Sequence, residues 1–316
     1  MTAPVPTVFY GSGSFAVPIL EALRGAPEVS VVGVVTVPDK PAGRQRVPTP
    51  TPVAARARTL GIPVLQPASL RSPEAVEAIR DLGPGLGVLA DYGRIVPPSI
   101  LELPAAGILN VHPSLLPRWR GASPIPATIL AGDIETGVTV IRMDAGLDTG
   151  PVVGVERWVL DGTEDAPGLE ARAASAGAQL LGRLLGPWLR GEIVPGPQGE
   201  LGMTMTRPLR REDGRLDPTR PAAELERQVR AMRPWPGTYM ESIAGRIGGL
   251  EVTAETGAIA QDRVPGRLGP DGLFAADGSC LVLRSVRPAG GRPMSWAELL
   301  RGRPGLVGST VIAGHA

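Results

Sequence analysis

Asn110 and His112 are two positions apart and are the residues of this chain best suited to catalysis. Asn110 is the only asparagine among 316 residues, and the one other histidine is His315. Both lie in the apolar run Ile-Leu-Asn-Val-His at 108–112, which predicts a β-strand that presents their side chains on the same face. An amide donor beside an imidazole can stabilise a developing oxyanion and assist proton transfer.

The segment after this run predicts a stiff loop at the edge of a sheet. Pro113 and Pro117 prevent the strand from continuing, which leaves Ser114 and backbone groups free for a ligand. Arg118 and Arg120 can hold an anionic substrate or simply lie in solvent. A single histidine on a strand is more often structural than catalytic. Here the stiff loop that follows His112 favours a functional site.

A second loop with candidate site residues follows the strand expected at 138–143. It carries two carboxylates, Asp144 and Asp148. Either can cap the loop, and either can orient His112 and raise its basicity, which would complete an acid–base unit. The residues alone do not choose between the two aspartates.

Strands and helices alternate through the first half of the chain. We expect strands at 7–10, 31–37, 63–65, 86–90, 108–112 and 138–143, and helices at 15–23, 53–60, 73–82 and 168–189. This order predicts an α/β fold with a doubly wound, mostly parallel sheet and a site at the carboxyl ends of its strands. Asp91, Tyr92 and Gly93 follow one strand directly and lie on that rim, although an ordinary loop explains them equally well.

The second half of the chain predicts a separate, smaller domain. Residues 196–220 lose periodicity and gain Pro, Gly and charge, which is typical of a linker between domains at 1–195 and 221–316. A helix is expected at 222–232. The short apolar runs that follow indicate a small β-barrel or sandwich; they are 242–247, 250–254, 272–275 and 280–286.

Composition limits the classes of function. Cys280 is the only cysteine, so no intramolecular disulfide forms, and with one interior histidine the chain predicts no metal site. We expect no leader, and the sequence has no apolar stretch of about 18 residues, so we expect a cytoplasmic protein without a membrane partner. Residues 1–206 hold 16 basic and 19 acidic side chains, and residues 207–316 hold 16 and 12. The basic C-terminal third can favour RNA, and we expect no DNA partner.

A glycine-rich turn after the first strand supports an alternative. Residues 11–16 fit the pattern G-x-G-x-x-A of dinucleotide-binding folds, with Asp39 as a conceivable ribose ligand. The acid comes later than the usual spacing of about 20 residues, and such turns occur in doubly wound folds whatever they bind. A nicotinamide-dependent oxidoreductase and a non-catalytic RNA-binding protein are therefore the alternatives from other classes.

These motifs together resemble the methionyl-tRNA formyltransferase family, whose members use 10-formyltetrahydrofolate. The resemblance covers nearly the whole chain. Its most specific parts are Asn110-x-His112 with Ser114-Leu115-Leu116-Pro117, then Arg118-Trp119-Arg120-Gly121, and Asp144-x-Gly146-Leu147-Asp148-Thr149-Gly150. It implies a Rossmann-like formyltransferase domain and a C-terminal OB-like domain that helps to hold tRNA.

The resemblance also implies the chemistry and the catalytic set. It assigns catalysis to Asn110, His112 and Asp148. The free α-amine of the acceptor attacks the formyl carbon, Asn110 and protonated His112 stabilise the oxyanion, and Asp148 orients His112 and assists proton movement. Formyl transfer of this kind needs no metal.

Further roles come from the same resemblance. The folate-contacting residues would be Ser114, Leu115, Leu116, Pro117, Tyr92 and Gly93. Phe15 would line a methionine pocket, and Arg44 and Arg46, in an inserted loop that begins at Pro38, would contact initiator methionyl-tRNA. Gly11-Ser12-Gly13 departs from the family's usual Gly-Thr-Pro, and the inserted loop is poor in lysine. An enzyme that formylates sugar amines is the alternative within the same family.

Overall fold

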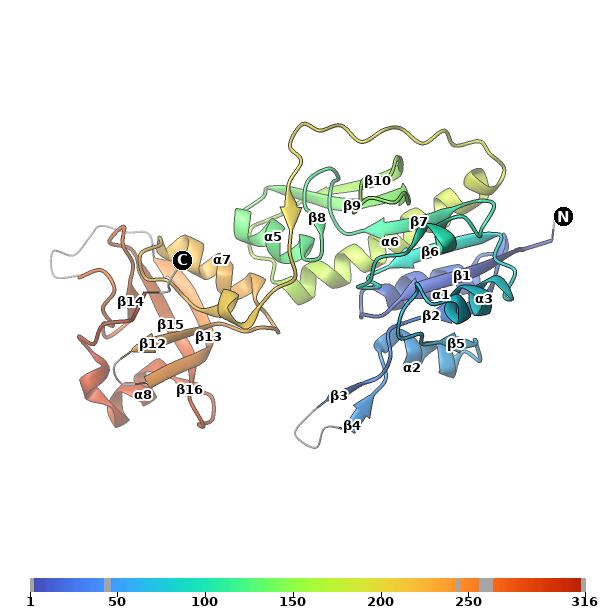
Figure 1. The fold of residues 1–316 in the computed structure, drawn as a ribbon. Coiled ribbons are helices and arrows are strands. Elements are labelled where there is room, and N and C mark those ends of the chain that lie inside the picture. The colour runs from blue at the N-terminus through green and yellow to red at the C-terminus, as the bar shows by residue number, and fades with distance from the viewer. Residues whose placement is uncertain (1–2, 43–46, 243–244, 256–263, 314–316) are drawn as a thin grey trace. The chain divides into compact units, whose positions relative to one another are not determined.

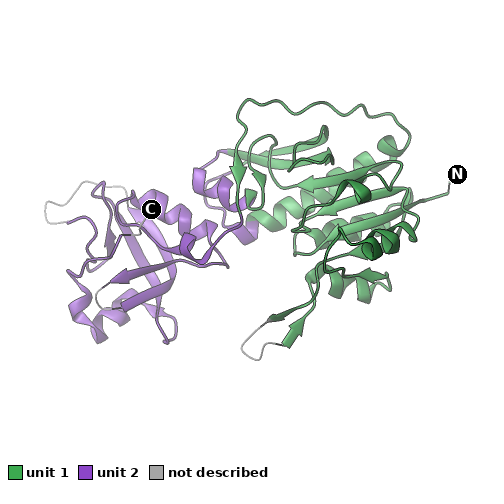
Figure 2. Cartoon of the chain, viewed as in Figure 1, with its two compact units in different colours: residues 1–124, 135–159, 169–207 green, residues 125–134, 160–168, 208–316 purple. Residues whose placement is uncertain are grey.

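A computed structural model describes residues 3–42, 47–242, 245–255 and 264–313, which form two compact units (Figures 1 and 2). Unit 1 comprises residues 1–124, 135–159 and 169–207, and unit 2 comprises 125–134, 160–168 and 208–316. Residues 196–207 of the expected linker thus group with unit 1, and the rest of that linker with unit 2.

A seven-stranded sheet forms the centre of unit 1, in the order β10-β9-β7-β6-β1-β2-β5. Its strands are β1 (Val5–Gly11), β2 (Val29–Val35), β5 (Val64–Leu65), β6 (Leu86–Ala90), β7 (Ile108–His112), β9 (Glu135–Arg142) and β10 (Val152–Val159). All neighbours from β5 through β7 pair in parallel. The predicted fold class, α/β with a mostly parallel sheet, is confirmed.

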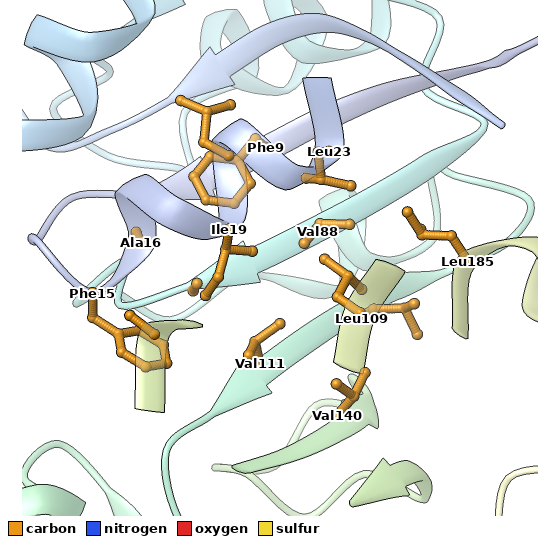
Figure 3. Close-up of a cluster of buried hydrophobic side chains, with 14 of the residues drawn as sticks. Phe9, Phe15, Ala16, Ile19, Leu23, Val88, Leu109, Val111, Val140 and Leu185 are labelled. Atoms are coloured by element: carbon orange, nitrogen blue, oxygen red, sulfur yellow. The ribbon is translucent and has the colours of Figure 1, made fainter. Parts of the chain in front are cut away.

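Helices and apolar side chains cover both faces of this sheet. The helices of unit 1 are α1 (Ala16–Gly25), α2 (Pro52–Thr59), α3 (Pro73–Arg80), α4 (Pro98–Leu101) and α6 (Ala166–Leu189), the last beginning within unit 2. On one face, α1, α2 and α6 pack in a core with Leu109 and Val111 of β7 (Figure 3). On the other, α3 and α4 pack in a core that includes Ile108. Alternation along β7 therefore directs Asn110 and His112 toward the face of Ile108.

One strand of the sheet runs against the others. β9 is antiparallel to β7, with Leu109 opposite Arg142 and His112 opposite Thr139, and β10 is antiparallel to β9. The sequence predicted this strand, at 138–143, within a mostly parallel sheet, but did not assign its direction. The helix before β9, α5 (Pro124–Ala131), groups almost wholly with unit 2 and so is not a crossover helix on the sheet.

Local sequence explains where the helices of unit 1 begin. Thr51 and Ser72 cap α2 and α3, because each side-chain oxygen accepts a hydrogen bond from the backbone N–H three residues later. A proline follows each cap at the first helical position, where the missing N–H has no intrahelical partner to lose. Both helices therefore start within one residue of the positions expected from the sequence.

The Pro-rich loop expected after β2 contains two short strands. β3 (Lys40–Ala42) and β4 (Val47–Thr49) pair in antiparallel fashion and extend from the body of unit 1 (Figure 1). Lys40 lies opposite Thr49. Arg44 and Arg46 fall between these strands, outside the described residues, so their predicted contact with tRNA stays a prediction.

Unit 2 contains a curled antiparallel half-barrel sheet, which confirms the predicted smaller β domain. Its strands are β12 (Tyr239–Ser242), β13 (Gly245–Glu255), β14 (Gly272–Phe274), β15 (Cys280–Pro288) and β16 (Met294–Ser295). Two helices, α7 (Ala222–Ala231) and α8 (Trp296–Gly302), pack against it, and short 3-10 helices lie at Arg211–Gly214 and Pro304–Leu306. The apolar run expected as one strand at 242–247 is instead divided, because Gly245 has φ +104° and pairs with Ser242 in a hairpin.

The apolar core that Leu109 of β7 joins gives a test of the fold. Leu109 has no exposed surface, so Leu109→Ala leaves a cavity and should lower the free energy of unfolding by about 2–5 kcal/mol. Chemical denaturation measures this change. Ile95→Ala is the control, because Ile95 is 69% exposed and its truncation should change stability by no more than about 0.5 kcal/mol. Similar changes in both variants would contradict the described packing.

Candidate active site

A single carboxylate connects the polar side chains of β7. Oδ1 of Asp148 accepts a hydrogen bond of 3.1 Å from Nδ2 of Asn110, and Oδ2 accepts one of 2.8 Å from the backbone N–H of Gly121. Oδ2 also lies 3.7 Å from Nδ1 of His112. Asn110 and His112 are each only 5% exposed. The structure therefore brings together the three residues predicted to be catalytic.

The antiparallel direction of β9 makes the position of Asp148 beside Asn110 difficult to predict from the sequence. β9 ends beside the amino-terminal part of β7, so the loop at 143–150 must fold back over the sheet before Asp148 can reach Asn110. Asp144 stays within its own loop, where it accepts hydrogen bonds from the backbone N–H of Gly146 and the hydroxyl of Thr149. The geometry thus places Asp148, and not Asp144, beside His112.

The loop after β7 orients the imidazole of His112. Its Nε2 lies 2.9 Å from the backbone oxygen of Trp119. A carbonyl can only accept, so Nε2 carries the proton in the neutral ring, and Nδ1 is left facing Asp148. The 3.7 Å gap to the carboxylate is longer than a hydrogen bond. Nδ1 is consequently the nitrogen able to exchange a proton with a substrate.

Ser114 differs from its prediction as a residue free for a ligand. It is fully buried, and its hydroxyl donates to the backbone oxygen of Arg118 at 2.6 Å. Thr139 holds the same stretch, since its hydroxyl donates to the oxygen of Ser114 and accepts from the N–H of Leu116. The Ser114 hydroxyl thus stabilises the loop, while Leu115, Leu116 and Pro117 are half-buried. Folate contact by this stretch stays a prediction.

The two arginines of this loop are not simply solvated. The guanidinium of Arg118 lies 4.2 Å from the ring centroid of Trp119. Arg120 donates two hydrogen bonds to the side-chain oxygen of Gln198, from Nε at 3.1 Å and from Nη2 at 2.7 Å. Arg120 is therefore bound to Gln198 through two of its N–H groups.

The glycine-rich turn after β1 is occupied by a protein side chain. The N–H of Ser12 donates to the backbone oxygen of Asp91 at 2.9 Å. A Cβ at Gly13 would lie 1.7 Å from Oδ2 of Asp91, so the aspartate side chain fills the space beside this glycine. A pyrophosphate at the turn would meet that carboxylate, which argues against the dinucleotide fingerprint.

The remaining predicted site residues occupy three different environments. Tyr92 is 1% exposed and packs edge-on against Tyr10, and its burial raises its pKa to about 12. Gly93 is exposed, with φ +76°. Phe15 is 3% exposed and belongs to the core drawn in Figure 3. Their roles toward folate and methionine stay predictions.

Backbone conformation marks the same region. In the described part of the chain, the non-glycine residues with positive φ are Asp91, Trp119 and Asp148, at +44°, +60° and +54°. Two of them contact the site directly, through the oxygen of Trp119 and the carboxylate of Asp148. Such conformations are unfavourable for most residues and cluster at functional sites.

Sequence reasoning missed a segment that closes this region, residues 196–206. Its short strand β11 (Met205–Thr206) pairs with β8 (Arg120–Gly121). Thr204 accepts a hydrogen bond from the N–H of Trp119 at 2.8 Å, and Gln198 binds Arg120. The alternation of Thr204 and Thr206 was the available signal, but the Pro and Gly before it favoured a linker.

Comparison with known proteins identifies the family. The sequence model described as "Formyl transferase" matches residues 6–185, and "Formyl transferase, C-terminal domain" matches 208–304. The chain is 42% identical over 303 residues to the methionyl-tRNA formyltransferase of Myxococcus xanthus, covering 96% of both chains. It is 43% identical over 298 residues to that of Chloroflexus aggregans, covering 93% of this chain and 96% of the relative. The chain belongs to the methionyl-tRNA formyltransferase family.

Membership in this family makes the protein a transferase and confirms the resemblance seen in the motifs. The alternatives of a nicotinamide-dependent oxidoreductase and of a non-catalytic RNA-binding protein were therefore wrong. Among solved structures, the N-formyltransferase from Helicobacter canadensis, in complex with folinic acid and dTDP-3-aminofucose, aligns with TM-score 0.61. It covers 88% of this chain and 98% of that one at 17% identity, which shows a shared fold. No helix in the described residues has the length and apolarity to cross a membrane.

The environment of Asp91 predicts a pH-dependent effect on stability. Loss of hydration around its carboxyl group, and secondly the charge of Glu170, raise its pKa from 3.8 to about 6, although the residue itself stays exposed at the rim. The folded state therefore disfavours the ionised form, and the resulting destabilisation is complete above pH 6 and disappears as the pH falls toward 4. Asp91→Asn, which tolerates positive φ, should raise the free energy of unfolding at pH 8 and much less at pH 4.5.

Chemical denaturation at both pH values checks this expectation. Asp81→Asn is the control, because it removes an exposed carboxylate of the same unit away from the turn. An equal gain at pH 8 and pH 4.5, or a loss at pH 8, would contradict the assigned cause.

Proposed function

We propose that this protein transfers the formyl group of 10-formyltetrahydrofolate to the α-amine of initiator methionyl-tRNA. The observation that carries this is near-full-length identity of 42–43% to relatives named methionyl-tRNA formyltransferase, over both matched domains. Such identity over the whole length favours a shared acceptor. Structures of sugar formyltransferases share the fold at far lower identity.

The geometry around Asp148 supports direct attack by the amine. The amine nitrogen forms a bond to the formyl carbon and gives a tetrahedral intermediate with a negatively charged oxygen. Asn110 donates one amide N–H to Asp148, and the described residues give its other N–H no partner. That second N–H is suited to bind the oxyanion, held in place by the carboxylate.

His112 and Asp148 are suited to move the proton. The attacking amine must lose a proton, and N10 of the folate must gain one before the carbon–N10 bond breaks. Nδ1 of His112 can take and return that proton, because Nε2 is committed to the oxygen of Trp119. The Asp148 carboxylate, 3.7 Å away, stabilises the charged ring in between. The products are formylated methionyl-tRNA and tetrahydrofolate.

We assign tRNA binding to unit 2 and to the loop that contains Arg44 and Arg46. In unit 2, a cavity of about 460 Å³ lies between α8 and the turn from β15 to β16. Arg292 and Arg303 line it together with Glu298, within a segment that carries more basic than acidic side chains. This charge suits contact with phosphates without base-specific recognition.

The two aspartates of one loop give a matched test of the chemistry. Asp148→Asn removes the charge beside His112 and should lower turnover by at least about 100-fold, the scale of losing an acid–base or oxyanion-stabilising group. Asp144→Asn changes the same atoms four residues away and should stay within a few-fold of the parent. Formylation kinetics at saturating substrates measure both. Near-normal turnover in Asp148→Asn would remove this residue from the mechanism.

A panel of acceptors tests the proposed reaction itself. The purified protein is incubated with 10-formyltetrahydrofolate and either methionyl initiator tRNA, methionyl elongator tRNA or a nucleotide-linked amino sugar. We expect formylation of the initiator tRNA with stoichiometric release of tetrahydrofolate, and little reaction with the sugar. Preference for the sugar would contradict the proposed acceptor. Protection against thermal unfolding by the folate reports donor binding separately.

A further inference from the structure

Gln198 occupies a central position in the segment of residues 196–206, which we term the strap. The strap follows α6 (Figure 1) and lies within unit 1, where Gly196 pairs with Val152 and β11 pairs with β8. It crosses both loops that carry groups of the candidate site. The strap is thus part of the catalytic unit, although its composition is typical of a linker.

The side-chain amide of Gln198 uses its full hydrogen-bonding capacity. Nε2 donates to the backbone oxygens of Asp148 at 2.8 Å and of Gly150 at 2.7 Å. Oε1 accepts both hydrogen bonds from Arg120. An amide has two donor hydrogens and two acceptor lone pairs, so all four positions are filled. Glutamate has the same size but, at neutral pH, has no donor hydrogens, so it cannot replace glutamine in these bonds.

These bonds close a ring around Asp148. Its carboxylate accepts from the N–H of Gly121, and its backbone oxygen accepts from Gln198, which in turn binds Arg120. Gly121 therefore binds the side chain of Asp148 directly. Arg120 is connected to the backbone of Asp148 through Gln198. The φ of Asp148 is +54°, in the left-handed region that aspartate tolerates better than most residues, and the hydrogen bonds of the ring hold the loop in this conformation.

We propose that Gln198 is a positioning residue, which places the Asp148 carboxylate against Asn110 and His112 by holding the backbone of its loop. This inference rests on the catalytic role proposed for Asp148. The hydrogen bonds that Gln198 makes among the described residues reach the backbone oxygen of Asp148 and none of the three catalytic side chains. Its loss should alter the chemical step and leave substrate binding largely intact, because the displaced group is the carboxylate and not a binding surface.

Two variants of Gln198 and one control test the role of its side-chain amide. Gln198→Ala removes every hydrogen bond and should lower kcat by about 10-fold to 100-fold, the scale of a small misplacement, with KM for the folate within about 3-fold. Gln198→Glu keeps an acceptor for Arg120 but loses both donors to the loop, so its kcat should fall as far. Gln228→Ala is the control, because Gln228 also donates to two backbone oxygens, those of Asp213 and Arg215, but in unit 2. It should keep kcat within about 3-fold at saturating tRNA.

A double mutant decides whether Gln198 acts through Asp148. In the Asp148→Asn background, Gln198→Ala should cost no further activity, since the group that it positions is already lost. Additive losses, or a Gln198→Glu variant with parental kcat, would overturn the proposal. Parental kcat in Gln198→Ala alongside a strong loss in Asp148→Asn would also overturn it and leave the proposed function intact. Parental kcat in Asp148→Asn alone would instead refute the catalytic assignment on which the inference rests.

Discussion

The arrangement of unit 1 around its candidate site depends on the largely buried carboxylate of Asp148. Its side chain is only 12% exposed, so the charge must be compensated by donors rather than by bulk water. The donors come from separate parts of the chain, the amide of Asn110 on β7 and the N–H of Gly121 in the following loop. One carboxylate thereby joins the 143–150 loop to β7 and to the loop after β7, and it lies 3.7 Å from the imidazole of His112.

Loops surround this carboxylate on its side of the sheet. α3 and α4 cover this face beside β1 and β6, but beside β7 and β9 it is closed by polar loops and by the strap. The antiparallel direction of β9 makes this possible, because the chain leaves β9 near the amino end of β7 and has to return across the face. Backbone groups of these loops form hydrogen bonds with the side chains of Thr139, Gln198, Thr204 and Thr206.

The glycine-rich turn shows how one local structure serves different sites. In dinucleotide-binding folds the second glycine admits a pyrophosphate, whereas here the space beside Gly13 is taken by the carboxyl group of Asp91. The turn and the strand–helix geometry are those of a doubly wound sheet in either case. Function therefore follows from the groups that reach the rim and not from the fold.

Much of this protein follows from local patterns. Alternation along 108–112 was sufficient to place Asn110 and His112 on one face, and a cap followed by proline was sufficient to start α2 and α3. The alternation and the helix caps both depend on residues that are close to one another in the sequence. Periodicity and composition also predicted the smaller β domain in the second half of the chain, and the family resemblance added the catalytic set.

The tertiary structure decided which distant groups meet. The choice of Asp148 over Asp144, the engagement of the Ser114 hydroxyl and the place of residues 196–206 in unit 1 all depend on how loops return across the sheet. Local periodicity carries no information on strand direction, and β9 reverses it. The sequence by itself determined which residues could perform the chemistry, and only the folded chain determined which groups hold them in place, because those hydrogen bonds join segments 27 to 50 residues apart.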